Sequence, residues 1–181
     1  MRELEVSYDR DTLREVYADH AAVRDRIGDL RTSIRTAADP VAELLARGEL
    51  VARLRGLGDL EDALAEARLA AERAEIVGTP VQQHLAALRL AHVLQWRTEF
   101  ADSNLMFEDL LTGLDRFGPV IEAFTHQRAG ENAYDQGHFA RARDHFARAL
   151  SIRREFEAPE DQIASSQLAM DAAGRGMKRA T

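Results

Sequence analysis

Residues 137–150 read GHFARARDHFARAL, and this stretch decides the fold class. Its apolar residues lie three, four and three residues apart, which is the spacing of one face of an α-helix. The same pattern occurs in residues 58–70, which read GDLEDALAEARLA, and in residues 98–110, which read TEFADSNLMFEDL. The large residue that opens each pattern recurs after 40 and then 39 residues, so the chain contains an internal helical repeat.

A second set of apolar positions repeats with the same period. It starts with Leu50, Val51 and Leu54 and recurs three times further along the chain. The recurrences are Leu90, Ala91 and Leu94; Ala129, Gly130 and Ala133; and Leu168, Ala169 and Ala172. Proline turns at residues 78–80, 118–119 and 158–161 stop one helix and start another at the same interval. The pattern predicts helices over residues 40–56, 60–77, 80–97, 101–117, 119–136, 139–157 and 160–173.

Residues 137–150, and equally residues 58–67, resemble the second helix of a tetratricopeptide repeat. The resemblance covers residues 41–173 approximately. It implies an all-α, right-handed α-α superhelix, a tetratricopeptide-like solenoid with about three and a half repeats over residues 40–173. The period of 39–40 residues exceeds the usual period of this family, so we expect longer helices or longer turns.

The N-terminal residues 1–39 do not fit the repeat. Residues at alternating steps of three and four predict one extra helix from about residue 10 to 37, ended by Asp39-Pro40, with these side chains packed along one seam: Leu13, Val16, His20, Val23, Ile27, Leu30 and Ile34. This helix either caps the first repeat or forms a coiled-coil dimer. We favour the cap and a monomer over a homodimer. At the other end, Gly174-Arg175-Gly176 predicts a flexible tail over residues 174–181.

Composition narrows the classes of function. The formal net charge of −7 argues against nucleic-acid binding, which needs a basic face. The sequence contains no cysteine, no apolar run long enough for a membrane span and no signal peptide, so we expect a cytoplasmic protein that does not bind membranes. Arginine is abundant while Lys178 is the only lysine, a bias that suggests a bacterial source.

No motif for catalysis or for binding a cofactor occurs in the sequence. The histidines His84 and His92, and likewise His138 and His145, are too far apart along their helices to chelate a metal. There is no nucleophile elbow, P-loop or dinucleotide fingerprint. We therefore expect no enzyme activity, no cofactor and no metal site.

A binding surface remains as the carrier of function. The resemblance implies a concave groove lined by the first helix of each repeat, where arginines and aromatic residues are typical of interface cores. The predicted partner-binding residues are Arg89, His92, Gln95, Trp96, Gln127, Arg128, Glu131 and Tyr134. Arg89 and Arg128 would suit an acidic or carboxylate-bearing partner segment. Trp96 could instead pack between adjacent repeats.

The sequence therefore predicts a protein–protein interaction module, an adaptor or regulatory scaffold that binds another protein or a peptide. The alternative is a tetratricopeptide-type regulator that senses a peptide or metabolite.

Overall fold

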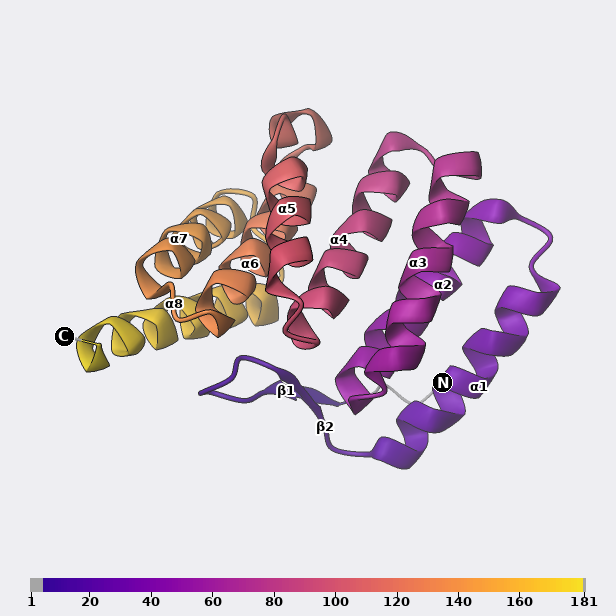
Figure 1. Cartoon of the computed structure of the whole chain (residues 1–181), viewed down its shortest axis with the longest axis horizontal. Coiled ribbons are helices and arrows are strands. Elements are labelled where there is room, and N and C mark those ends of the chain that lie inside the picture. The colour runs from indigo at the N-terminus through magenta and orange to yellow at the C-terminus, as the bar shows by residue number, and fades with distance from the viewer. Residues whose placement is uncertain (1–4, 181) are drawn as a thin grey trace. The chain divides into compact units, whose positions relative to one another are not determined.

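The computed structural model describes residues 5–180 (Figure 1). These residues form two compact units. Unit 1 holds residues 5–8 and 14–99, and unit 2 holds residues 9–13 and 100–180. Residues 9–13 are the tip of a β-hairpin whose two strands belong to unit 1.

Unit 1 consists of the hairpin strands and the first four helices. The elements are β1 (Val6–Tyr8), β2 (Glu15–Tyr17), α1 (His20–Thr36), α2 (Pro40–Leu57), α3 (Leu60–Val77) and α4 (Pro80–Trp96). The strands are antiparallel, with Val6 opposite Tyr17 and Tyr8 opposite Glu15. Each helix packs on the next one along the chain, α2 also contacts α4, and β2 lies against α2. Helices α2 and α4 are the first helices of their repeats, and we call such helices first-type and the helices that follow them within a repeat second-type. The two first-type helices of this unit contact each other directly.

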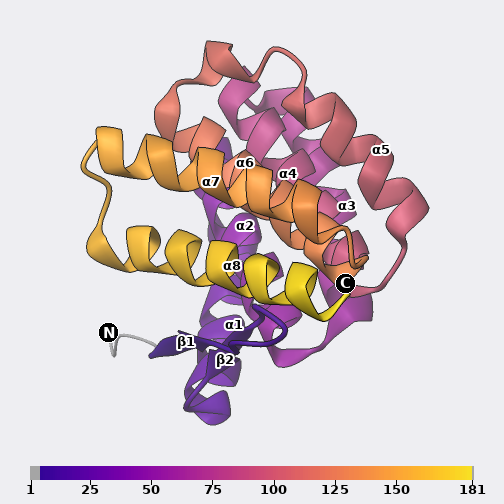
Figure 2. The same cartoon turned by 90° about the vertical axis from the view of Figure 1, so that its left-hand side faces the viewer.

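Unit 2 repeats this arrangement with the remaining helices. The elements are α5 (Phe100–Leu111), the 3-10 helix η1 (Leu114–Phe117), α6 (Pro119–Asp135), α7 (Phe139–Glu155) and α8 (Glu160–Arg179). Helix α7 packs between α6 and α8, and Figure 2 shows α7 and α8 side by side. The first-type helices α6 and α8 also touch. Stacking of successive helical hairpins is the principle of a solenoid.

The three turns that join first and second helices have the same backbone geometry. Gly58, Thr98 and Gly137 follow α2, α4 and α6 and have left-handed φ values of 83°, 62° and 75°. In each turn the left-handed residue donates its N–H to the carbonyl three residues back, and the next residue donates to the carbonyl five residues before itself, as in a Schellman motif. The predicted repeat period is thereby confirmed in the backbone.

Helix starts are set by local chemistry. Asp39 accepts hydrogen bonds from the first backbone N–H groups of α2, and Thr79 and Gln82 form a capping box at the start of α4. Pro40, Pro80 and Pro119 occupy the first helical positions, where a missing N–H has no cost.

Small and large residues alternate at equivalent positions in the interior. Ala63, Ser103 and Ala142 open the apolar faces of α3, α5 and α7, and none is exposed to solvent. The rings of Phe107 and Phe146 are buried one turn further on. A Cβ atom at Gly130 would lie 2.6 Å from the Phe146 ring, so α6 carries glycine where this ring presses on its backbone. The all-α, solenoid-like fold is confirmed.

The predicted helix over residues 10–37 is wrong in its first half. Residues 6–17 form the hairpin, and α1 begins only at His20, where Asp19 caps it by accepting from the Ala22 N–H. Strand periodicity replaces helix periodicity, so Val16 is exposed while Tyr17 is buried. His20 is also exposed, at the first position of the helix. The seam is therefore reduced to Val23, Ile27 and Leu30, with Ile34 half-buried.

Two helix ends also differ from the prediction. Helix α8 continues to Arg179 instead of ending at residue 173, because Gly176 lets the helix approach the ring of Phe139: a Cβ atom there would lie 2.5 Å from Cδ1. The segment 174–180 is thus helical up to Arg179, and Thr181 lies outside the described residues. The predicted helix over 101–117 is split at Gly113, whose left-handed φ of 62° ends α5 and precedes η1.

Candidate partner-binding surfaces

In unit 1, the predicted binding residues of α4 lie largely inside the protein. His92, Gln95 and Trp96 are buried, and Arg89 is half-buried. The guanidinium of Arg89 lies over the backbone of α2 at Gly48, where a Cβ atom would approach its Cζ to 2.7 Å. Glycine at this position therefore makes room for the arginine.

A buried arginine organises the rest of this cluster. Arg55 of α2 is only 3% exposed, and its guanidinium forms an ion pair with Glu15 of β2 and contacts the ring of His92. It also lies 4.9 Å from the centre of the Trp96 ring, and Arg14 lies 4.7 Å from the same centre. The Trp96 indole N–H donates to Nε2 of His92 at 3.2 Å. Arg14 and Glu15 therefore cover this part of α2 and α4.

In unit 2, three predicted residues form one hydrogen-bonded chain along α6. The Glu131 carboxylate is buried, pairs with Arg128 at 2.8 Å and accepts from the Gln127 amide at 3.1 Å. The Gln127 carbonyl oxygen accepts from the Ser166 hydroxyl at 2.7 Å, and this hydroxyl also accepts from buried Arg153 at 2.7 Å. Two first-type helices, α6 and α8, and the second helix α7 are thus joined by polar side chains.

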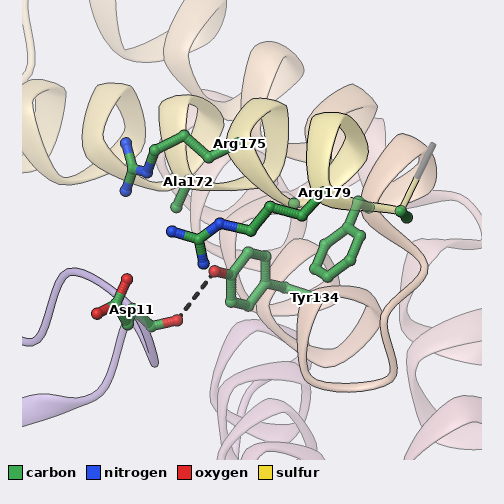
Figure 3. A pocket seen from close by; sticks show the side chains of 8 residues that line it. Asp11, Tyr134, Ala172, Arg175 and Arg179 are labelled. Carbon is green, nitrogen blue, oxygen red and sulfur yellow. Dashed lines mark hydrogen bonds between the residues drawn. The ribbon is translucent and has the colours of Figure 1, made fainter.

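Tyr134 lies at a separate pocket of unit 2 (Figure 3). Its hydroxyl donates to the main-chain carbonyl of Asp11 at 2.9 Å, and burial raises the pKa of its phenol. Its ring meets Phe139 edge to face, with centroids 5.4 Å apart. The pocket has a volume of about 190 Å³, and it is lined by Asp11, Tyr134, Phe139, Ala172, Arg175, Gly176, Arg179 and Ala180.

Residues of α8 line both the Tyr134 pocket and a second, larger hollow. Its volume is about 570 Å³, and Arg175 lines both this hollow and the Tyr134 pocket. Arg143 of α7 and Lys178 of α8 add positive charge, while Asp171 adds a negative one. Met170 and Met177 supply flexible apolar side chains, which adapt to irregular partners. The two hollows together suit a partner group that is partly apolar and negatively charged.

The structure thus groups the eight predicted residues into a cluster on α4, a chain along α6 and the single residue Tyr134. Arg14, Glu15, Arg175 and Arg179 were not predicted as neighbours of these groups. The sequence did carry a signal for the hairpin, since Asp9 precedes Thr12 in an Asx-turn pattern and Asp19 is a helix N-cap. Whether the eight residues bind a partner stays a prediction.

The structure also shows a histidine pair between α6 and α7. Nδ1 of His126 lies 3.0 Å from Nδ1 of His145. Burial, and then the neighbouring His126, lower the pKa of His145 to about 4. Within the described residues, no group of three or more His, Asp or Glu side chains is placed to hold a metal ion. No helix in that part of the chain has the length and apolarity needed to cross a membrane.

Comparison with solved structures supports the fold. The chain is similar to BtubC (BKLC) from P. vanneervenii, with a TM-score of 0.67 and 16% identity over 87% of this chain and 67% of that one. It is also similar to PlcR of Bacillus thuringiensis, solved in complex with the peptide PapR7 and DNA, with a TM-score of 0.62 and 11% identity over 88% of this chain and 65% of PlcR. The chain therefore spans about two thirds of the length of these neighbours.

At 16% and 11% sequence identity, the similarity to these two structures establishes only the fold of this chain. No protein-family model matches the sequence, and no curated protein matches it.

Proposed function

We propose that this protein is a non-enzymatic interaction module of the tetratricopeptide type, which binds a segment of a partner protein on its first-type helices. One observation carries the proposal: the chain's own residues 10–15 already make peptide-like contacts with these helices. In unit 2, α6 and α8 hold main-chain carbonyls of this segment. In unit 1, α2 holds its glutamate. Helix surfaces that hold main-chain carbonyls and a carboxylate in this way have the donors that a partner segment needs.

The chemistry of these surfaces favours an acidic partner. Arg89, Arg128 and Arg175 all belong to first-type helices, in a chain whose net charge is −7. Guanidinium groups hold carboxylates through charge-assisted, often bidentate, hydrogen bonds. Arginines on the first-type helices of each unit would select partners by charge as well as by shape.

Paired arginine variants test this proposal. Partners are captured with the full chain from a lysate of its source and identified, and the affinity of the identified partner is then measured. The variant Arg89→Ala/Arg128→Ala should weaken that affinity by at least about 10-fold, since each hydrogen bond to a charged group contributes about 1.5–3 kcal/mol. Circular dichroism and the melting temperature check that the fold is intact.

The matched control is Arg68→Ala/Arg141→Ala. These two arginines are exposed on the second-type helices α3 and α7. The control should bind the partner as the wild type does. If it loses the partner while Arg89→Ala/Arg128→Ala keeps it, the functional surface lies on the second-type helices and the proposal fails.

A second candidate is a regulator that responds to a small peptide or metabolite. The similarity to PlcR, whose structure contains a peptide, favours it, as do the two adjoining hollows on α8. A thermal-shift screen of short peptides and anionic metabolites distinguishes the two candidates. A small molecule that raises the melting temperature of the wild type, and not of Arg175→Ala, would favour the sensor.

A further inference from the structure

We infer that the place which residues 9–13 fill in unit 2 is a binding socket for a partner segment with the same chemistry: a short acidic turn followed by one buried aliphatic side chain. This inference rests on the proposed function and deepens it by naming the kind of segment. We call this place the α8 socket. Its apolar wall consists of Ala133, Ala142, Phe146, Ala169, Ala172 and Ala173.

A single side chain anchors the chain's own segment in the α8 socket. Leu13 is 7% exposed and packs against the apolar wall, whereas residues 9–12 are all exposed. A loop that belonged to the core would bury more of its length. One buried anchor on an otherwise exposed stretch is instead the way in which short peptides dock on folded proteins.

The remaining contacts use the main chain of the segment. The Tyr134 hydroxyl donates to the Asp11 carbonyl at 2.9 Å, and Arg175 donates to the Arg10 carbonyl at 3.2 Å. Every peptide carries such carbonyls, so these two donors can hold a segment of different sequence. Selectivity then comes from the aliphatic anchor and from charge.

The segment organises itself before it docks. The Asp9 carboxylate accepts from the N–H groups of Asp11 and Thr12 at 3.1 and 2.7 Å, and from the Thr12 hydroxyl at 2.8 Å. These bonds to the Thr12 and Asp11 groups lower the pKa of the Asp9 carboxyl. An acidic residue that closes a turn is therefore part of the chemistry that a partner segment would copy.

Backbone strain makes the chain's own segment replaceable. Leu13 has a left-handed φ of 59°, a conformation that costs free energy for any residue with a side chain other than Asn or Asp. The strain reduces the net stabilisation by the buried Leu13 side chain. A partner segment with an aliphatic side chain on an unstrained backbone would make the same contacts without this cost. It would therefore bind the α8 socket more tightly than the chain's own segment does.

Space and charge beside the segment are left for a partner group. The pocket of about 190 Å³ opens next to Tyr134, and the labelled guanidinium groups of Arg175 and Arg179 both lie beside it (Figure 3). The Arg179 guanidinium makes no hydrogen bond or ion pair with any other residue in the range 5–180. A carboxylate of the partner would fit between the two arginines.

A peptide in trans tests the socket. The probe is fluorescein-labelled Tyr-Asp-Arg-Asp-Thr-Leu-Arg, the sequence of residues 8–14, and the readout is fluorescence anisotropy with the full chain. In the wild type the tethered segment competes at millimolar effective concentration, so the probe should bind weakly. In Leu13→Ala the tethered anchor is lost, and the probe should bind at least about 10-fold tighter. A probe with alanine in place of its leucine should not bind.

Three further variants keep the test decisive. Val16→Ala, which shortens an exposed aliphatic side chain of the same hairpin, should bind the probe as the wild type does. Leu13→Ala/Arg175→Ala should bind it several-fold more weakly than Leu13→Ala. If Leu13→Ala loses its helical signal, Asp9→Ala replaces it, because this exposed residue holds the turn together without contributing to the core.

The inference fails if the probe binds Leu13→Ala, or Asp9→Ala in its place, no tighter than the wild type. It also fails if the alanine probe binds equally well. A wild-type chain that dimerises in light scattering, and becomes monomeric as Leu13→Ala, would overturn the assignment to a separate partner, because the turn would then fill the socket of a second copy. A negative probe result with intact dependence on Arg89 and Arg128 would leave the proposed function standing without this socket.

Discussion

The two units have the same helical plan but differ in the balance of interactions that join their helices. In unit 1, ion pairs connect the helices: Arg26 of α1 with Glu49 of α2 at 2.6 Å, and Arg73 of α3 with Glu43 of α2 at 3.1 Å. In unit 2, Arg148 of α7 also pairs with Glu122 of α6 at 2.6 Å, but rings pack on Gly130 and Gly176, and amides bond to hydroxyls. The Asn132 side chain of α6, for example, accepts from the Ser103 hydroxyl of α5 at 2.8 Å.

This difference shows that one repeat pattern can be stabilised in two ways. The pattern demands only that each helix cover its neighbour's apolar face. Unit 1 has alanine at the position where unit 2 has Phe107 and Phe146, so its interior offers less apolar area at this level. Its partly buried charge pairs are individually weaker than a buried ring and depend on pH and salt, whereas the packing of the Phe107 and Phe146 rings does not.

The largest effect should come from the phenylalanine rings of unit 2. Phe146→Ala and Phe107→Ala should each lower the free energy of unfolding by about 3–5 kcal/mol, because each removes a fully buried ring that its surroundings cannot refill. Urea unfolding followed by circular dichroism measures this. Phe156→Ala, at a 56% exposed position, is the control and should cost less than about 0.5 kcal/mol. If all three variants are equally stable, the packing assigned to unit 2 is wrong.

The buried ion pair of unit 1 should rank second. Glu15→Gln keeps the shape of the side chain but removes the charge that compensates Arg55, and we expect a loss of about 2–3 kcal/mol in the same urea assay. The matched control is Glu61→Gln. The Glu61 carboxylate pairs with Arg97, but its side chain is 83% exposed, so the loss should stay below about 0.5 kcal/mol. Equal losses for the two variants would contradict a special role for the buried pair.

A smaller, pH-dependent effect should come from the histidine pair of unit 2. Because the folded pKa of His145 is about 4, below its ordinary value of 6.5, the unfolded chain binds more protons between these values. Stability should therefore fall as the pH is lowered from about 6.5 to 4. Solvent screens the partly exposed pair, so we expect about 1–2 kcal/mol.

Urea unfolding at pH 7 and pH 4.5 measures the contribution of His145. The variant His145→Gln should show a smaller loss between these two pH values than the wild type. His138→Gln, at an exposed histidine, should behave as the wild type does. A wild-type loss that His145→Gln leaves unchanged would assign the pH dependence to other groups.

The sequence by itself determined the repeat, its period and most helix bounds. The predicted helix over residues 60–77 coincides with α3, and those starting at residues 40, 80, 119, 139 and 160 begin where the structure begins them. Apolar spacing, prolines and caps act within one or two helical turns, so sequence patterns report them faithfully. Even Thr98, which departs from glycine, has the left-handed geometry of its equivalents Gly58 and Gly137.

Only the tertiary structure decided the conformation of the N-terminal residues, the position where α8 ends and the surroundings of the predicted binding residues. The spacing of Leu13 and Val16 fits a helix equally well, but Leu13 gains its burial from α6, α7 and α8, more than 100 residues away. Gly176 stays helical because the ring of Phe139 packs on its backbone. Intrinsic helix propensities differ by at most about 1 kcal/mol between ordinary residues and glycine, so contacts between distant segments outweigh them, and such contacts leave no periodic trace in the sequence.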